Sequence, residues 1–152
     1  MKKILISIFV IWVLFLSSCT TPENIDFTKD FPNEVIVWET FDVKLSVKNN
    51  DTKARELRSF DFESTFFDWF LVNSISPEIA EEFEIFWIHV YEFKKNIEKW
   101  EQMDVIFNLK ALKQWDYSSN LDLCIDWDTS CIYNTIRIIV NENEEVIVYE
   151  KE

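Results

Sequence analysis

Hydrophobic and polar residues alternate along much of this chain, which is the pattern of β-strands with one buried face. The clearest run begins at Thr40, where Phe41, Val43, Leu45 and Val47 are separated by polar residues. Further strands are predicted where apolar residues alternate or gather between turn residues, in segments 60–62, 66–75, 83–93, 103–111, 121–125, 132–140 and 146–149.

One short helical turn is also consistent with the sequence. Ser76 and Pro77 have the residue types of a helix cap and first helical position, and the turn would extend through Glu82. Seven to nine short strands without intervening helices favour an all-β fold, an antiparallel Ig-like β-sandwich, over alternating strands and helices. We expect the folded domain to span residues 34–150.

The N-terminus has the parts of a secretory signal peptide, expected to span residues 1–18. Lys2 and Lys3 precede an unbroken apolar run from Ile4 to Leu16. This run of 13 residues is shorter than the roughly 18 to 20 that a membrane-spanning helix requires. A cleaved signal is therefore favoured over a permanent transmembrane anchor.

The tetrapeptide Leu16-Ser17-Ser18-Cys19 resembles the lipobox of bacterial lipoproteins. The resemblance implies that Cys19 is acylated and becomes the first residue after cleavage. The partner of Cys19 would then be the lipid bilayer, and the protein would be anchored at an extracytoplasmic face of the cell envelope. Residues 19–33 contain two prolines and no sustained alternation, so we expect a flexible tether there.

Two further cysteines, Cys124 and Cys131, predict a disulfide if the protein is exported to an oxidising compartment. Two reduced thiols are the alternative. A hairpin that pairs these cysteines also pairs Leu123 with Ile132. In that register both cysteines lie on the face opposite to the core.

The chain of 152 residues has seven tryptophans and no glycine, whereas average usage predicts about 11 glycines. Tryptophan often stands in turn-like contexts where glycine is common. Our hypothesis is that these positions are UGA codons that the cell reads as glycine. The alternative is a tryptophan-rich protein with aromatic loop tips. The question applies to Trp38, Trp69, Trp87, Trp100, Trp115 and Trp127.

Residues 34–49, EVIVWETFDVKLSVKN, resemble the first two strands of bacterial surface Ig-like domains, including those called CARDB (cell-adhesion-related). Those domains open with V-x-V-G-E-x-F-x-V-x-V-x-N, and the family's glycine falls at Trp38. The resemblance covers about the first third of the domain. It implies a sandwich that binds a partner.

The formal net charge of −13 at pH 7 argues against a nucleic-acid partner, which requires a basic surface. The single histidine, His89, lies in an apolar strand-like run and is interpreted as structural, so we identify no catalytic residues and expect no cofactor. A carboxylate-based hydrolase is the least favoured class. Its candidate acids would be Glu81, Glu82, Glu84, Asp126 and Asp128.

Residues 126–130, Asp-Trp-Asp-Thr-Ser, partly resemble a calcium-binding loop, to which Asp122 or Asp116 would add oxygen ligands. Asp126, Asp128 and Asp122 are therefore a weak Ca²⁺ candidate. An ordinary acidic hairpin loop is the favoured interpretation, because the distant bidentate glutamate of an EF-hand is missing.

The sequence as a whole predicts a membrane-anchored lipoprotein with a non-catalytic Ig-like module for protein binding, adhesion or envelope scaffolding. The alternative is a carbohydrate-binding module that uses exposed tryptophans such as Trp115 and Trp127. The partner is then an unknown protein or polysaccharide. The sequence alone assigns no residue to its binding.

Overall fold

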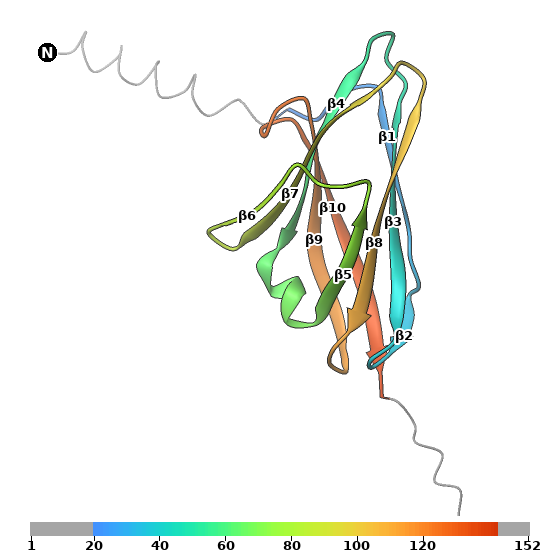
Figure 1. The fold of residues 1–152 in the computed structure, drawn as a ribbon, viewed down its shortest axis with the longest axis vertical. Coiled ribbons are helices and arrows are strands. Elements are labelled where there is room, and N and C mark those ends of the chain that lie inside the picture. The colour runs from blue at the N-terminus through green and yellow to red at the C-terminus, as the bar shows by residue number, and fades with distance from the viewer. Residues whose placement is uncertain (1–19, 143–152) are drawn as a thin grey trace, which may run out of the picture.

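The computed structural model describes residues 20–142, which form ten β-strands and one short 3-10 helix (Figure 1). The elements are β1 (Ile25–Asp30), β2 (Glu34–Ile36), β3 (Thr40–Asn49), β4 (Arg55–Glu63), η1 (Ser64–Asp68), β5 (Phe70–Ser76), β6 (Glu81–Ile85), β7 (Ile88–Ile97), β8 (Gln102–Ala111), β9 (Trp115–Ile125) and β10 (Cys131–Asn141). Cys19, the predicted signal peptide and the predicted strand 146–149 lie outside the described residues. No helix within residues 20–142 is long and apolar enough to span a membrane.

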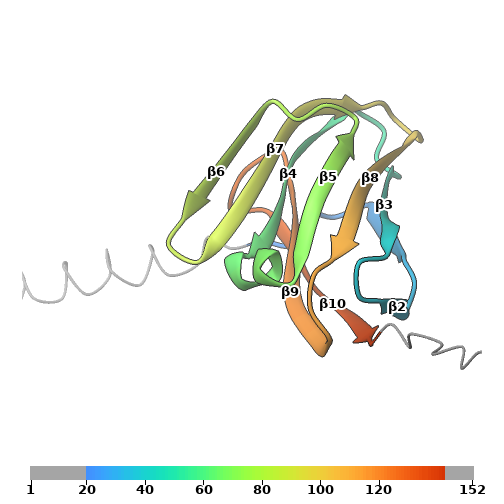
Figure 2. The ribbon, with the colours of Figure 1, turned by 60° about the horizontal axis from the view of Figure 1, so that its bottom comes forward.

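The strands form two sheets, β1-β3-β8-β5 and β2-β10-β9-β4-β7-β6 (Figures 1 and 2). Every pairing is antiparallel except that of β2 with β10. In immunoglobulin domains strands A, B, E and D form one sheet, and C, F and G form the other. Here β1, β3, β8 and β5 take the first four places, and β4, β9 and β10 take the other three. The predicted all-β, Ig-like sandwich is confirmed.

The core lies between the two sheets and contains many aromatic side chains. Alternation along β3 buries Phe41, Val43, Leu45 and Val47, as the sequence predicts. Phe107 of β8 crosses to the opposite layer, where its ring centroid lies 5.3 Å from that of Phe62 on β4 and 6.3 Å from that of Phe60. Contacts of this kind join the layers through large apolar surfaces.

The prediction of a flexible tether through residue 33 was wrong. Residues 25–30 form β1, which pairs along its length with β3. Phe27 of β1 packs against Phe60, with ring centroids 5.8 Å apart. Only Ile25 and Phe27 mark this strand in the sequence, between two prolines, which is too short an alternation to identify without its partner strand.

Three local predictions also differ from the structure. The predicted strand 66–75 begins only at Phe70, because residues 64–68 form η1. In η1 the adjacent Phe66 and Phe67 both pack inward, with Phe66 buried and Phe67 on Phe62 (ring centroids 5.9 Å apart), whereas neighbours in a strand point to opposite faces. Residues 77–80 form no helical turn between β5 and β6. Segment 83–93 belongs to a hairpin of two strands, β6 and β7, so the described chain has ten strands instead of seven to nine.

Candidate functional site

The hairpin of β6 and β7 lies at one edge of the six-stranded sheet (Figure 2). It carries exposed apolar side chains. Phe83, Ile85, Phe86 and Trp87 expose 38%, 50%, 84% and 70% of their surfaces. A contiguous group of exposed apolar side chains on a globular domain is typical of an interaction site. We call these four residues the hairpin patch.

The tip of the hairpin is a two-residue turn, Phe86 and Trp87, that hydrogen bonds hold against η1. The Ser64 amide donates to the Trp87 carbonyl oxygen (2.8 Å), and Ser64 Oγ donates to Glu84 Oε1 (2.7 Å). Phe86 has a φ of 56°, in the left-handed region. Two-residue hairpin turns require positive φ, which usually selects glycine or asparagine instead of an aromatic residue.

His89 helps to hold the two strands of this hairpin together. Its Nε2 lies 2.8 Å from Glu82 Oε1 on β6. Its ring centroid lies 4.5 Å from that of Phe67 and 4.8 Å from that of Tyr91. These are contacts to a carboxylate and two aromatic rings, and no serine or cysteine takes part in them.

Two carboxylates face each other next to the hairpin, on the outer surface of the six-stranded sheet. Asp61 of β4 stands directly opposite Asp122 of β9 in the strand register. Burial raises the pKa of Asp61, and burial together with the Asp61 charge raises the pKa of Asp122 to about 6. Asp61 Oδ1 is buried and has no hydrogen-bond partner. Neither carboxylate forms an ion pair with a basic residue of segment 20–142. We call these two residues the carboxylate pair.

A pocket of about 80 Å³ is bordered by the carboxylate pair and, from the hairpin patch, by Trp87. Its lining combines acidic, amide and apolar side chains: Asp61, Phe62, Glu63, Trp87, Ile88, Asn120 and Asp122. Uncompensated carboxylates favour a positively charged group, and the neighbouring hairpin favours an apolar one. The arrangement therefore has the chemistry of a binding surface for a ligand with both kinds of group.

Cys124 and Cys131 form the predicted disulfide, with Cα atoms 4.1 Å apart. They are opposite each other in the register of β9 and β10, as are Leu123 and Ile132. Both cysteines lie on the outer face of the sheet, as predicted. They are nevertheless buried, with exposed fractions of 1% and 5%. The disulfide closes the loop of residues 125–130.

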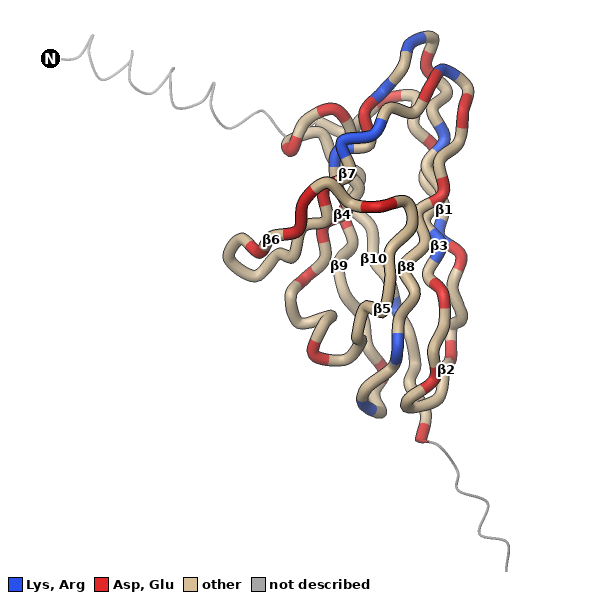
Figure 3. The backbone as a smooth tube through the Cα atoms, in the orientation of Figure 1, with Lys and Arg blue, Asp and Glu red and all other residues tan. Residues whose placement is uncertain are grey.

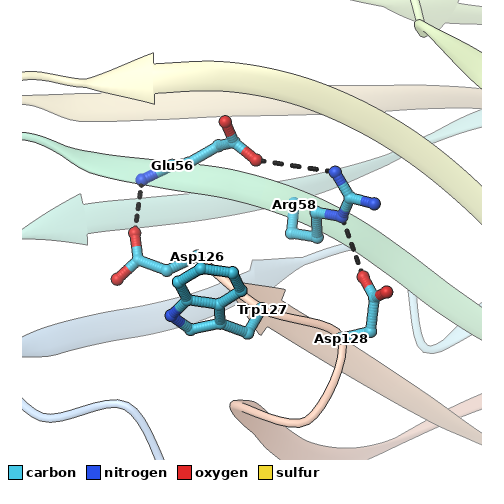
Figure 4. Close-up of a pocket in the computed structure, with 5 residues that line it drawn as sticks. All are labelled: Glu56, Arg58, Asp126, Trp127 and Asp128. Carbon is cyan, nitrogen blue, oxygen red and sulfur yellow. Dashed lines mark hydrogen bonds and ion pairs between the residues drawn. The ribbon is translucent and has the colours of Figure 1, made fainter.

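The acidic loop 125–130 directs its carboxylates toward basic groups instead of toward a shared cation position (Figure 4). Asp126 accepts hydrogen bonds from Arg55 Nε (2.6 Å) and from the Glu56 amide (2.8 Å). Asp128 accepts one from Arg58 Nε (2.8 Å). An open groove of about 540 Å³ here is lined by Glu56, Arg58, Asp126, Trp127 and Asp128. Because arginines already compensate the charge, the loop has the character of an ion-pair network.

The other two proposed calcium ligands lie apart from this loop. Asp122 belongs to the carboxylate pair, and Asp116 lies at the opposite end of β9. There Asp116 accepts two hydrogen bonds from Arg137, of 2.8 and 2.6 Å. The structure thus does not bring the candidate ligands together, and within residues 20–142 no group of three or more metal-binding side chains is found.

Two tryptophans occupy backbone positions that favour glycine. Trp38 has a φ of 73° and Trp100 a φ of 66°. Each is the third residue of a hydrogen-bonded turn, with N–O distances of 2.9 Å in turn 36–39 and 3.1 Å in turn 98–101. Positive φ at the third residue is the type II turn, where glycine is usual. A left-handed conformation costs other residues roughly 1–2 kcal/mol. Both side chains are about 60% exposed, so burial does not offset this cost.

The tryptophans predicted to stack on sugars do not form one surface. Trp115 begins β9 and Trp127 follows its last residues, so the two lie at opposite ends of the sandwich. Trp115 instead stacks on Trp69, with ring centroids 5.7 Å apart. Trp127 belongs to the acidic loop and lines its groove (Figure 4).

The hairpin patch was not predicted, because residues 83–93 have the composition of a single strand. A signal was present: Phe83 and Ile85 occupy odd positions, whereas Ile88 and Val90 occupy even ones. In a single strand, odd and even positions point to opposite faces of the sheet. Apolar residues that change from odd to even positions can share one face if a two-residue turn separates two strands. The carboxylate pair had no comparable signal, because it depends on which strands become neighbours.

Comparison with known proteins gives similarity in fold only. No family model matches the chain, and no curated protein matches its sequence. The similar solved structures include a cohesin module from a family 33 glycoside hydrolase of Clostridium perfringens, at 20% identity and TM-score 0.49, covering 78% of this chain and 98% of that one. They also include a CARDB domain from Pyrococcus furiosus, at 15% identity and TM-score 0.43, covering 83% and 96%. The description as an Ig-like sandwich therefore rests on the strand order, and these similarities assign no activity.

Proposed function

We propose that this protein is a non-catalytic binding module of the cell envelope, anchored through acylated Cys19, and that it binds a protein partner at the hairpin patch. The observation that carries the proposal is the exposure of Phe83, Ile85 and Phe86. These three side chains persist whether position 87 is tryptophan or glycine. The adjoining carboxylate pair favours a partner surface that combines apolar and basic side chains.

Two observations support the proposed location in the cell envelope, one from the sequence and one from a covalent bond. The lipobox directly precedes Thr20, the first described residue. The disulfide of Cys124 and Cys131 is typical of proteins that fold outside the reducing cytoplasm. A labelled fatty acid supplied to the cells tests the anchor. We expect the wild-type protein to become labelled and the Cys19→Ser variant to remain unlabelled. The control variant Cys124→Ser/Cys131→Ser keeps the label, and a wild type without label contradicts the anchor.

The partner site is tested by a photo-crosslinking amino acid placed at Phe86 in the full-length protein in its own cells. Leu71 on β5 is the matched control, because it is an apolar strand residue with 51% exposure in the other sheet. We expect one discrete protein adduct from position 86 and none from position 71. Equal adducts at both positions, or none at either, contradict binding through the hairpin patch.

The contribution of the carboxylate pair is tested with the same photo-crosslinking protein. Asp61→Asn/Asp122→Asn removes the acidic charge and keeps the side-chain volumes, so we expect the adduct yield at position 86 to fall several-fold. Asp116→Asn is the control, since this residue lies at the far end of β9. An unchanged yield in the double variant shows that the partner does not need the carboxylates.

A second function, polysaccharide binding, is favoured by the stack of Trp69 on Trp115, which forms a continuous aromatic surface at one end of the sandwich. Lys113 lies over the Trp69 ring, 5.4 Å from its centroid. This function requires that both positions are tryptophan in the cell. Retention of the native protein on an insoluble polysaccharide, lost in Trp115→Ala, supports it. Equal retention of both proteins contradicts it.

A further inference from the structure

The first described residues, from Thr20 onward, join the sandwich at one of its two ends (Figure 1). The loops 50–54, 98–101 and 125–130 lie at this end. We call this end the anchor pole. The Thr20 amide donates to the Thr129 carbonyl oxygen (3.1 Å), and Thr20 also forms a β-bridge with Ser130. The fold therefore includes the residue that directly follows Cys19.

The next residues of the entering chain are fixed as well. Pro22 is buried, and the Glu23 carbonyl oxygen accepts a hydrogen bond from Arg55 Nη1 (3.1 Å). Arg55 also binds the carboxylate of Asp126 in the loop 125–130. One guanidinium thus joins the entering chain to the anchor pole. No length of free chain separates Thr20 from the domain.

Two loops of the anchor pole are held together by one buried amide. Asn49 is fully buried, and its Nδ2 donates to the carbonyl oxygens of Lys53 (2.9 Å), Ile97 (2.9 Å) and Glu98 (3.2 Å). Its backbone amide donates to the Glu101 carbonyl oxygen (2.9 Å). The loops 50–54 and 98–101 therefore present one surface with a defined shape.

Basic residues gather toward the anchor pole, although the chain has a net charge of −13 (Figure 3). Arg55, Arg58 and Lys94 of this group form ion pairs with acidic neighbours. Among residues 20–142, the remaining members of the group form no ion pair. They are Lys48, Lys53, Lys95 and Lys99.

We propose that the anchor pole rests directly on the bilayer, with Lys53 and Lys99 against anionic headgroups. This inference relies on the proposed acylation of Cys19. One residue spans at most about 3.6 Å, so acyl chains on Cys19 hold Thr20 and its loop at the membrane surface. A basic side chain near an anionic bilayer strengthens attachment about fivefold.

The same orientation leaves the hairpin patch accessible. Strand β7 begins beside the tip of the hairpin and ends with Ile97 at the anchor pole. The tip is thus separated from the anchor pole by the ten residues of β7, about 33 Å of extended chain. A partner can reach the hairpin patch while the anchor pole contacts lipid.

Hydrogen exchange of the membrane-purified, full-length mature protein tests the orientation. The protein is compared in non-ionic detergent and in nanodiscs of phosphatidylethanolamine with one-third phosphatidylglycerol. We expect amides of loops 50–54 and 98–101 to exchange several-fold more slowly in nanodiscs. The loops 37–39 and 112–114 at the opposite end serve as internal controls and should exchange equally in both. The mass of the Cys19 peptide reports acylation in the same sample.

Charge variants test the headgroup contact. Lys53→Glu/Lys99→Glu should lose the protection in anionic nanodiscs, whereas Lys110→Glu/Lys113→Glu, near the opposite end, should keep it. Absence of acylation overturns both the anchor and the orientation. Acylation with equal exchange at the two ends overturns the orientation alone. Protection that survives in the Lys53/Lys99 variant overturns the assignment of these lysines.

Discussion

At the residue scale, the positive φ of Trp38 and Trp100 bears on which amino acid the cell places at these two positions. Both have positive φ at the third residue of a turn, and both are largely exposed, in a chain that contains no glycine. We predict that the native protein has glycine at these two positions, encoded by UGA. Tandem mass spectrometry of native peptides measures this directly. Tryptophan in those peptides, or UGG codons in the gene, would falsify the hypothesis.

The positive φ of the same two residues also predicts how glycine substitutions change the free energy of unfolding. Trp38→Gly and Trp100→Gly should each raise the free energy of unfolding by about 1 kcal/mol, because relief of the left-handed conformation exceeds the entropic cost of glycine. Trp69→Gly should lower it, because Trp69 is half-buried and packs on Trp115 and Tyr117. Urea unfolding of the tryptophan-containing protein and its variants distinguishes these signs. A loss of stability in all three variants contradicts the argument from φ.

At the scale of elements, Asn49 connects the end of β3 to the loops on either side of it. Asn49→Ala should lower the free energy of unfolding by about 2–4 kcal/mol, because buried carbonyl oxygens lose their donor. Asn73→Ala is the control, since Asn73 is exposed and donates to Asn108 Oδ1 (3.0 Å). Denaturant titration gives both values. Equal effects show that the amide of Asn49 does not organise the loops.

The pairing of β4 with β9 makes stability depend on pH. The pKa of Asp122 is raised to about 6 in the folded state, so the folded protein binds its proton more tightly than the unfolded chain does. Between pH 6 and pH 4 we therefore expect this group to increase stability as pH falls. The effect is on the order of 1 kcal/mol after allowance for solvent screening of a half-buried group.

Below pH 4 the trend should reverse, because hydrogen bonds from Lys44, Gln102 and Ser46 lower the pKa of Asp104 to about 2. Protonation of that carboxylate removes stability that is present at higher pH. Thermal unfolding between pH 3 and pH 7 measures both the rise in stability between pH 6 and pH 4 and the fall below pH 4. Asp122→Asn should reduce the rise between pH 6 and pH 4, and Asp116→Asn should keep it in full. Asp61→Asn/Asp122→Asn should remove it, because burial also raises the pKa of Asp61. An undiminished rise in Asp122→Asn refutes the assignment to this residue.

At the scale of the whole molecule, sequence patterns predicted the sandwich and the pairing of the two cysteines. Both depend on local periodicity, because side chains alternate in every strand and a short hairpin fixes its own register. The carboxylate pair was not predictable, since Asp61 and Asp122 meet only after β4 and β9 become neighbours. Strand β1 was missed for the same reason, because its pairing with β3 is what identifies it.

The anchor pole also determines how far the other end of the domain stands from its attachment point. The described chain enters at Thr20 and leaves after Asn141 at the opposite end (Figure 1). Strands β9 and β10, of 11 residues each, join these ends, and 11 residues of extended strand measure about 36 Å. On the proposed orientation the sandwich is a rigid spacer. A fluorescent group attached just after Asn141 should lie at this height above a bilayer that carries an energy-transfer acceptor.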